Sequence, residues 1–177
     1  MNPNCHFLLA QLARSATCLA LLGASWVYAL PSDQNQSIYI TADKQEISLK
    51  DGVVTYIGDV KLIQGTLHIN ADRLSVHKDK KQTEEFVLAE GGPAHYEQQP
   101  EEGKAIVHAE AGLINYNLKT QMLVLDKNVA IEQAGAITKG GHVDYDTKSQ
   151  TFKATKGDDN PTGRVETVIP PKTDKDK

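Results

Sequence analysis

The chain has 177 residues, of which 40% are hydrophobic and 24% are charged, and its formal net charge is −4. This length suits one domain or one extended sheet structure, and the hydrophobic content excludes a chain too polar to bury a core. A mildly acidic protein has no electrostatic attraction to phosphate backbones, so we expect no nucleic-acid partner.

Residues 1–29 are predicted to be a cleavable signal peptide. Arg14 precedes an apolar run over residues 16–24, and a cleavage site with modest side chains ends at Ala29. The alternative is a retained membrane anchor, because the uncharged stretch 15–32 is near the lower length limit of a spanning helix. Its strongly apolar part is short, however, and this favours cleavage.

Removal of the signal peptide would leave a chain without cysteine. Cys5 and Cys18 both lie within it, so the exported chain can form neither a disulfide nor a thiolate metal site. An exported protein without disulfides suits a bacterial periplasm better than a small secreted scaffold. We expect the structured domain to span residues 30–169 and the polar tail, residues 170–177, to be disordered.

The exported chain reads as a series of short strands with alternating apolar and polar residues. Period-two alternation places one set of side chains on one face of a sheet, and no window shows a convincing helical stripe. Turn signals separate the segments at Asp51-Gly52, Gly58-Asp59 and Gln64-Gly65. The predicted strands, in chain order, are 38–41, 47–50, 54–56, 60–62, 67–69, 74–76, 85–89, 93–97, 105–109, 112–117, 121–126, 129–133, 136–138, 142–146, 150–154 and 164–169.

An internal repeat is the most informative feature of the sequence. Its four copies begin at Ala42, Ala71, Ala111 and Gly140, with spacings of 29, 40 and 29 residues. Repeats of this period indicate units that bury their apolar faces against their neighbours. Each unit would be at least a pair of strands, and the wide spacing would contain an inserted loop at residues 98–103.

Polar residues give no indication of an active site. The five histidines of the exported chain show no recognised ligand spacing, so we expect no metal and no cofactor. His68 and His142 alternate with apolar neighbours and should point outward. Asp43 and Asp72 recur in the repeat, where turn hydrogen bonding accounts for them better than acid catalysis does. The protein is therefore not expected to be an enzyme.

Three segments carry a resemblance to a known family, namely Ile38–Asp43, Gly58–Val60 and Gln64–Asp72. They resemble the OstA-like domain family of lipopolysaccharide transport, and the likeness extends over most of the exported chain. Gln64–Asp72 is its most specific part. Within the family, a cleavable signal peptide and a polar tail favour the periplasmic component over the membrane-anchored one.

The resemblance implies an all-β fold, an elongated open antiparallel β-jellyroll built from repeated short strands, with an apolar interior. It also implies a ligand, lipopolysaccharide, whose lipid A acyl chains would lie in that interior. The resemblance implies a lipid-binding role for Ile38 and Ile40 in particular, because they begin the first strand. The candidate lipid-binding residues are Ile38, Ile40, Val54, Tyr56, Leu67, Ile69, Phe86, Tyr116, Leu123, Leu125 and Tyr145. The inward set from which they come also contains Ile47, Leu49, Val60, Leu62, Leu74, Val76, Leu88, Ile114, Val129, Ile131, Val143 and Phe152.

The two ends of an open sheet suggest partners. Unpaired backbone groups on edge strands invite strand addition, and the segments 38–41 and 164–169 are the candidates here. Head-to-tail repetition of such a contact would build a filament. In the family, the filament would bridge an inner-membrane LptC-like protein and an outer-membrane LptD-like protein across the periplasm.

Two other interpretations remain open from the residues alone. Periodicity by itself favours plain core packing for each apolar residue, which would make the protein a structural β-solenoid or adhesin with a filled interior and no lipid. A periplasmic hydrolase on a β-scaffold would need clustered polar residues in a cleft, and the aliphatic lining argues against it.

Overall fold

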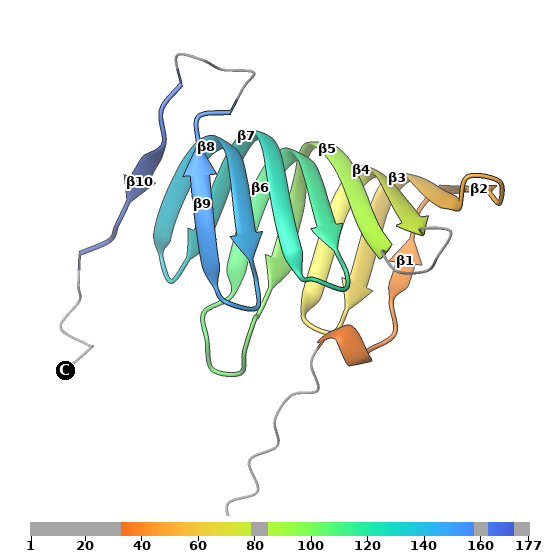
Figure 1. Ribbon diagram of the computed structural model, residues 1–177, viewed down its shortest axis with the longest axis horizontal. Coiled ribbons are helices and arrows are strands. Elements are labelled where there is room, and N and C mark those ends of the chain that lie inside the picture. Colours follow the sequence, from red (N-terminus) through yellow and green to blue (C-terminus); the bar gives the residue numbers. More distant parts are fainter. Residues whose placement is uncertain (1–32, 79–84, 158–162, 172–177) are drawn as a thin grey trace, which may run out of the picture.

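The computed structural model describes residues 33–78, 85–157 and 163–171. The predicted signal peptide, residues 1–29, lies outside these ranges, and so do residues 172–177 of the predicted tail. The described part contains a short 3-10 helix and ten strands, and the strands form one antiparallel sheet (Figure 1). The elements are η1 (Asp33–Asn35), β1 (Tyr39–Thr41), β2 (Lys44–Ser48), β3 (Val53–Gln64), β4 (Leu67–Lys78), β5 (Glu85–Gln98), β6 (Val107–Asn117), β7 (Met122–Gln133), β8 (Ala136–Asp146), β9 (Thr151–Thr155) and β10 (Glu166–Val168).

The sheet is open and has similar ends. Strands β3 to β8 each pair with the next strand in the chain. At one end, β1 and β2 both pair with β3, and at the other end β9 and β10 both pair with β8. This arrangement confirms the predicted elongated, open, antiparallel all-β fold. It also places edge strands at both ends of the sheet, where the sequence suggested them.

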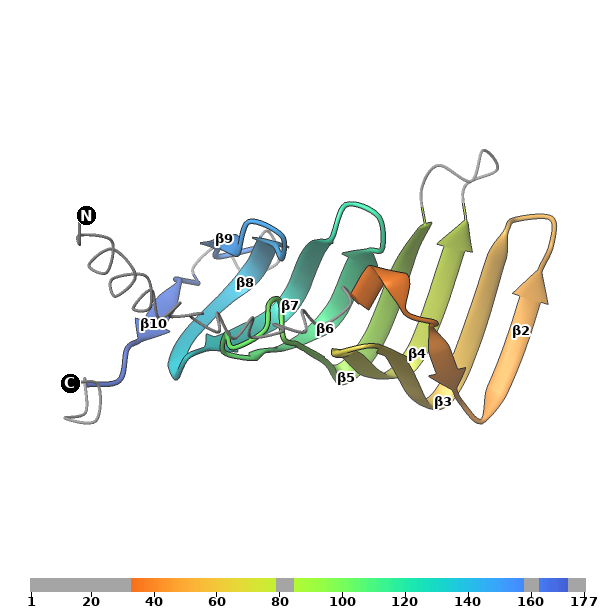
Figure 2. The ribbon, with the colours of Figure 1, turned by 90° about the horizontal axis from the view of Figure 1, so that it is seen from below.

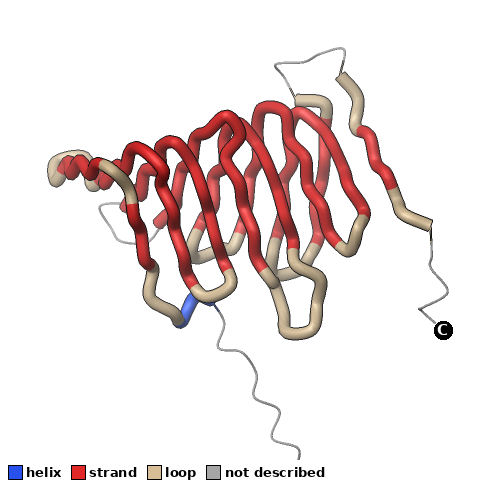
Figure 3. Tube along the Cα trace, turned by 180° about the vertical axis from the view of Figure 1, so that it is seen from behind, coloured by secondary structure: helices blue, strands red, loops and turns tan. Residues whose placement is uncertain are grey.

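A crease runs across the sheet because each long strand shifts register near its middle. The shifts fall at Ile57/Val60, Asn70/Arg73, Glu90/Ala94, Glu110/Leu113 and Asp126/Val129. They lie side by side and bend the sheet into two facing leaves (Figures 2 and 3). Leaf I contains β1, β10 and residues 60–71, 94–111 and 129–140. Leaf II contains β2, β9 and residues 53–57, 73–78, 85–90, 113–126 and 142–146.

The crease corrects the prediction of many short strands. Gly58-Asp59 is a bulge inside β3 rather than the expected turn. Gly58 has φ of +84°, a left-handed conformation that glycine adopts without strain, and a Cβ there would collide with the carboxylate of Asp43. A bulge adds a residue and bends a strand without ending its pairing. The predicted strands 54–56 and 60–62 are therefore two halves of one strand.

The sequence repeat marks this crease. Ala71, Ala111 and Gly140 lie at the register shifts of β4, β6 and β8, and Ala42 lies in the gap between β1 and β2. Each copy is followed by the next antiparallel strand, so the repeating unit is a bent hairpin. The spacing of 40 contains the loop 99–106 between β5 and β6, close to the predicted insertion.

Apolar neighbours form a continuous row across the inner face of leaf II. Each member is the Cα partner of the next, in the order Ile47, Val54, Val76, Val87, Tyr116, Leu123, Tyr145 and Phe152. The members from Val87 to Tyr145 are at most 2% exposed, whereas the terminal Ile47 and Phe152 are 60% and 44% exposed. The row is thus covered in the middle and uncovered at both ends of the sheet.

Three residues of the predicted inward set do not lie on the inner face of the sheet. Phe86 and Leu88 face outward, and Phe86 stacks on His77 with ring centroids 4.6 Å apart. Val87 and Ala89 occupy the inner positions instead and are almost fully buried. Leu49 follows β2 in a turn and is exposed. Because residues 86–89 are all apolar, alternation could not identify their inward members.

Candidate functional site

An apolar groove opens between the two leaves at the β1–β2 end of the sheet. It has a volume of about 310 Å³, and residues from both leaves line it. Four predicted lipid-binding residues are among them, with Ile38 and Ile40 beside leaf I and Val54 and Tyr56 on leaf II. The full lining is Ile38, Ile40, Gly52, Val54, Tyr56, Leu62, Val76, Lys78, Glu85, Val87 and Leu118.

The interior beyond this groove is closed by packing. Six other predicted residues lie there, each at most 2% exposed, namely Leu67, Ile69, Tyr116, Leu123, Leu125 and Tyr145. Tyr96 of leaf I meets Tyr116 of leaf II across the interior, with ring centroids 6.0 Å apart and planes at 55°. The structure therefore divides the predicted site into an open groove and a packed core, with Phe86 in neither.

Several lining residues were not among the candidates. Val87 was missed because Phe86, the residue before it, was predicted to point inward. Leu118 lies in the turn between β6 and β7, where no alternation exists to identify it. Lys78 and Glu85 lie at the groove with their charged groups 3.6 Å apart. This pair gives the otherwise apolar groove a polar edge.

A chain of polar groups leads from the surface into the closed interior. The Asp33 carboxylate accepts a hydrogen bond from Gln98 Nε2 at 2.7 Å, and Gln98 Oε1 accepts one from the Tyr96 hydroxyl. Burial raises the pKa of Tyr96 well above its usual value and raises the pKa of Tyr116 to about 12. The buried hydroxyl of Tyr145 has no hydrogen-bond partner among the described residues. These tyrosines are neutral in any physiological buffer.

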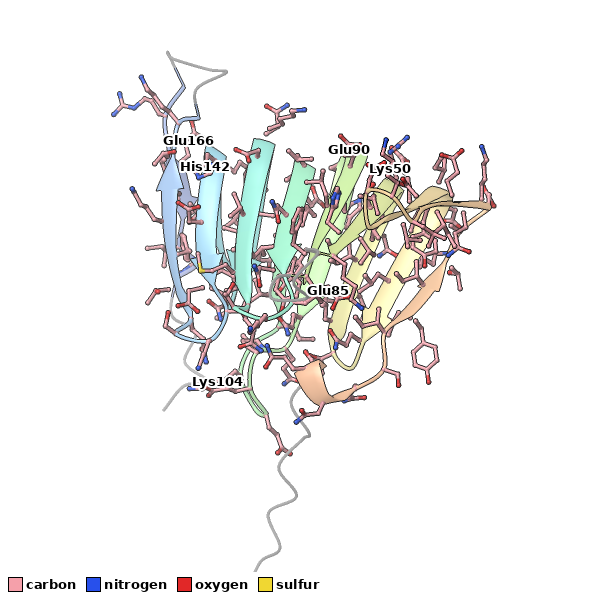
Figure 4. All side chains as sticks on the ribbon, turned by 45° about the vertical axis from the view of Figure 1, so that its right-hand side comes forward. Lys50, Glu85, Glu90, Lys104, His142 and Glu166 are labelled. Atoms are coloured by element: carbon pink, nitrogen blue, oxygen red, sulfur yellow. The ribbon has the colours of Figure 1, made fainter. Side chains whose placement is uncertain are left out.

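The outer face carries ordinary surface ion pairs. His142 Nδ1 lies 2.7 Å from Asp126, and its Nε2 lies 3.2 Å from Asp144. The hydrogen bond to Asp126 is the main reason why the pKa of His142 is raised. Glu90 and His142 lie along the crease, at the edge opposite Lys104 of the loop 99–106 (Figure 4). His68 is exposed, as predicted.

Other chemistries find no support in the described ranges. No group of three histidine, cysteine or acidic residues there could hold a metal ion. The backbone N–H of Asp43 donates to Gly58 O at 3.0 Å and so joins the connection between β1 and β2 to the bulge of β3. No helix in the described ranges is long and apolar enough to cross a membrane.

Comparison with known proteins decides the family. The family described as "LptA/(LptD N-terminal domain) LPS transport protein" matches residues 39–151, which is more than half of the chain. The chain belongs to this family. The LptA/LptD N-terminal family is one of transport proteins, which agrees with the expectation of a non-enzyme and with the resemblance noted in the sequence.

Individual members of the LptA/LptD N-terminal family match over most of their length. The lipopolysaccharide export system protein LptH of Pseudomonas aeruginosa is 34% identical over 157 residues, covering 86% of this chain and 90% of LptH. LptA of Escherichia coli K12 is 33% identical over 160 residues, covering 89% of this chain and 84% of LptA. The crystal structure of the Pseudomonas LptH aligns with a TM-score of 0.74 and 32% identity, over 80% of this chain and 100% of that one.

Proposed function

We propose that this protein carries lipopolysaccharide across the periplasm, with the lipid A acyl chains held between the two leaves. The observation that carries this proposal is the apolar groove at the β1–β2 end, in a member of a lipopolysaccharide transport family. Its lining is largely aliphatic, and the charged pair Lys78–Glu85 lies at its edge. Such an arrangement suits an amphipathic ligand whose chains are buried and whose head group stays in water.

The energetics of acyl-chain burial support a groove of this size. Each buried CH₂ contributes about 0.8 kcal/mol, and one acyl chain alone gives only reversible binding, so firm binding requires that more than one chain of the lipid be buried. An open apolar surface has no such stabilising role in a structural β-solenoid, which would fill its interior. The packed core from Tyr96 to Tyr145 does fit that alternative, but the groove does not. A carrier accounts for both regions.

The exposed ends of the inner row support head-to-tail assembly. Ile47 on β2 and Phe152 on β9 are the two uncovered ends of one apolar row. Addition of a β2 edge to the β9 edge of a second copy would join the two rows and cover both residues. The same edges would join LptC-like and LptD-like proteins at the ends of a bridge. Sedimentation should show concentration-dependent assembly that Ile47→Asp abolishes, and an unchanged series of species would refute this joint.

Photo-crosslinking to purified lipopolysaccharide tests the carrier function. We would place p-azidophenylalanine at Tyr56, which lines the groove, and at Phe86, an aromatic residue on the outer face. Lipid capture is expected at Tyr56 and not at Phe86. Equal capture at both positions, or none at Tyr56, would overturn the proposal.

A matched pair of substitutions measures affinity in the same site. Ile40→Asp should weaken binding about 10- to 100-fold, which corresponds to the loss of one buried aliphatic side chain. Tyr39→Asp introduces the same charge one residue earlier, at a position that is 68% exposed. It should leave the affinity within about twofold.

A further inference from the structure

The N-terminal segment crosses the mouth of the fold. On one side of the mouth lie the leaf I connections, including the turn between β3 and β4, and on the other side lie the leaf II connections, including the turn between β6 and β7. Figure 2 looks into this mouth and shows η1 between the two rows of turns. Residues 33–38, which we call the strap, therefore lie where the leaves would otherwise be open to solvent.

The strap is anchored firmly to leaf I through Asp33. Its carboxylate accepts hydrogen bonds from the Thr66 backbone N–H, the Thr66 hydroxyl and Gln98 Nε2, each at 2.7 Å. All three are partly buried, and hydrogen bonds to a carboxylate are stronger than neutral ones. In addition, Gln64 Nε2 donates to the carbonyl of Gln36 at 3.1 Å. The anchor thus consists of four contacts to one leaf.

The strap also contacts leaf II through Gln34, and these contacts are weaker than those of Asp33 with leaf I. Gln34 Nε2 donates to the carbonyls of Leu118 and Lys119, at 2.9 and 3.3 Å. Both contacts are solvent-exposed, so water competes with them. The contacts of Gln34 with leaf II, which we call the clasp, should therefore break more readily than the anchor at Asp33.

An amphipathic lipid cannot move along the interior while the clasp is closed. Its chains lie between the leaves, but its charged head group must stay in water because burial of unpaired charge is prohibitive. The mouth must therefore open along the whole path of the lipid. The strap crosses that path at the end of β5 and the β6–β7 turn, between Tyr56 of the groove on β3 and Tyr145 of the closed interior on β8.

We propose that the strap is a gate, anchored to leaf I by Asp33 and clasped to leaf II by Gln34, and that release of Gln34 admits the lipid from the groove into the interior. This inference rests on the proposed carrier function. It assigns Asp33 and Gln34 a positioning role that no local pattern in the sequence indicates. If the strap is a gate, the same substitution should change the amount of lipid in the interior and leave the amount in the groove unchanged.

The test uses two reporters in the full exported chain, with lipopolysaccharide as the probe. p-Azidophenylalanine at Tyr56 reports the groove, and at Tyr145 it reports the interior, where the lost hydroxyl had no partner among the described residues. Gln34→Ala should raise capture at Tyr145 about two- to fivefold, the factor expected for one exposed hydrogen bond, with little change at Tyr56. A short bismaleimide link between Gln34→Cys and Lys119→Cys should abolish capture at Tyr145 and keep it at Tyr56.

Gln99→Ala is the matched control. Its side chain also donates to an exposed backbone carbonyl, that of Lys104 at 3.0 Å, but it does not join the two leaves. It should leave both reporters unchanged, and circular dichroism should show that every variant is folded. Equal capture at Tyr145 in the native, Gln34→Ala and linked proteins would overturn the gate while the carrier function stands. Absence of capture at Tyr56 in all of them would overturn the carrier function and the gate together.

Discussion

The β1–β2 end and the middle of the sheet use the same residue types for different purposes. At the end, Val54 and Tyr56 of leaf II face Ile40 and Leu62 of leaf I across a groove. In the middle, the equivalent positions meet and exclude water, as Tyr96 and Tyr116 do. The difference arises because an interior strand has neighbours on both sides, whereas β1 and β2 have only β3. An apolar inner face therefore becomes a core or a binding surface according to its distance from the edge.

The largest expected effect is on stability, and it compares the same substitution in the two regions. Leu125 is fully buried in the middle, and Leu118 is half-buried at the groove. Leu125→Ala should lower the free energy of unfolding by about 2–5 kcal/mol, because it leaves a cavity in a closed core. Leu118→Ala should lower it by only about 1 kcal/mol. Urea denaturation measures both, and equal losses would show that the groove is as tightly packed as the core.

The sequence predicts which segments have an apolar face better than it predicts which residues of each strand point inward. Ile38, Ile40, Val54 and Tyr56 all line the groove, which agrees with the inward direction that alternation indicated for them. Phe86 was assigned inward wrongly, because an uninterrupted apolar segment carries no period. Each bulge also resets the alternation by adding a residue, which a local pattern cannot show.

Long-range polar contacts are a second feature that the sequence does not predict. Asp33 reaches Thr66 and Gln98, which lie 33 and 65 positions away in the chain. No motif links these residues, since each supplies a common hydrogen-bonding group. The antiparallel pairing of β4 with β5, which sets His68 opposite Glu97, brings the β3–β4 turn and the end of β5 to the same rim. The strap could therefore be found only in three dimensions.

A smaller effect distinguishes two tyrosines within the closed interior. Tyr96 donates a hydrogen bond to Gln98, whereas the hydroxyl of Tyr145 has no partner among the described residues. Tyr96→Phe should destabilise the protein by about 1–2 kcal/mol, because it leaves a buried amide oxygen unpaired. Tyr145→Phe removes an unpaired hydroxyl and should stabilise it by about 1 kcal/mol. Thermal and urea unfolding should both show opposite signs, and a loss of stability in Tyr145→Phe would indicate a partner for that hydroxyl.

The smallest expected effect concerns pH and lies outside both regions, at the crease. The pKa of folded His142 is raised, chiefly by its hydrogen bond to Asp126, so the folded state binds this proton more tightly than the unfolded state. The resulting stabilisation is fully present below the unfolded pKa of about 6.5 and is lost as the pH rises through the higher folded pKa. Since both partners are partly exposed, it should amount to about 0.5 kcal/mol. His142→Gln should therefore be less stable than the native protein at a pH of about 5.5 and equal to it at about 8.5.

His95→Gln is the control, because His95 and Glu110 are about half exposed and 3.4 Å apart. If both variants show the same pH dependence, the hydrogen bond between His142 and Asp126 is not its source.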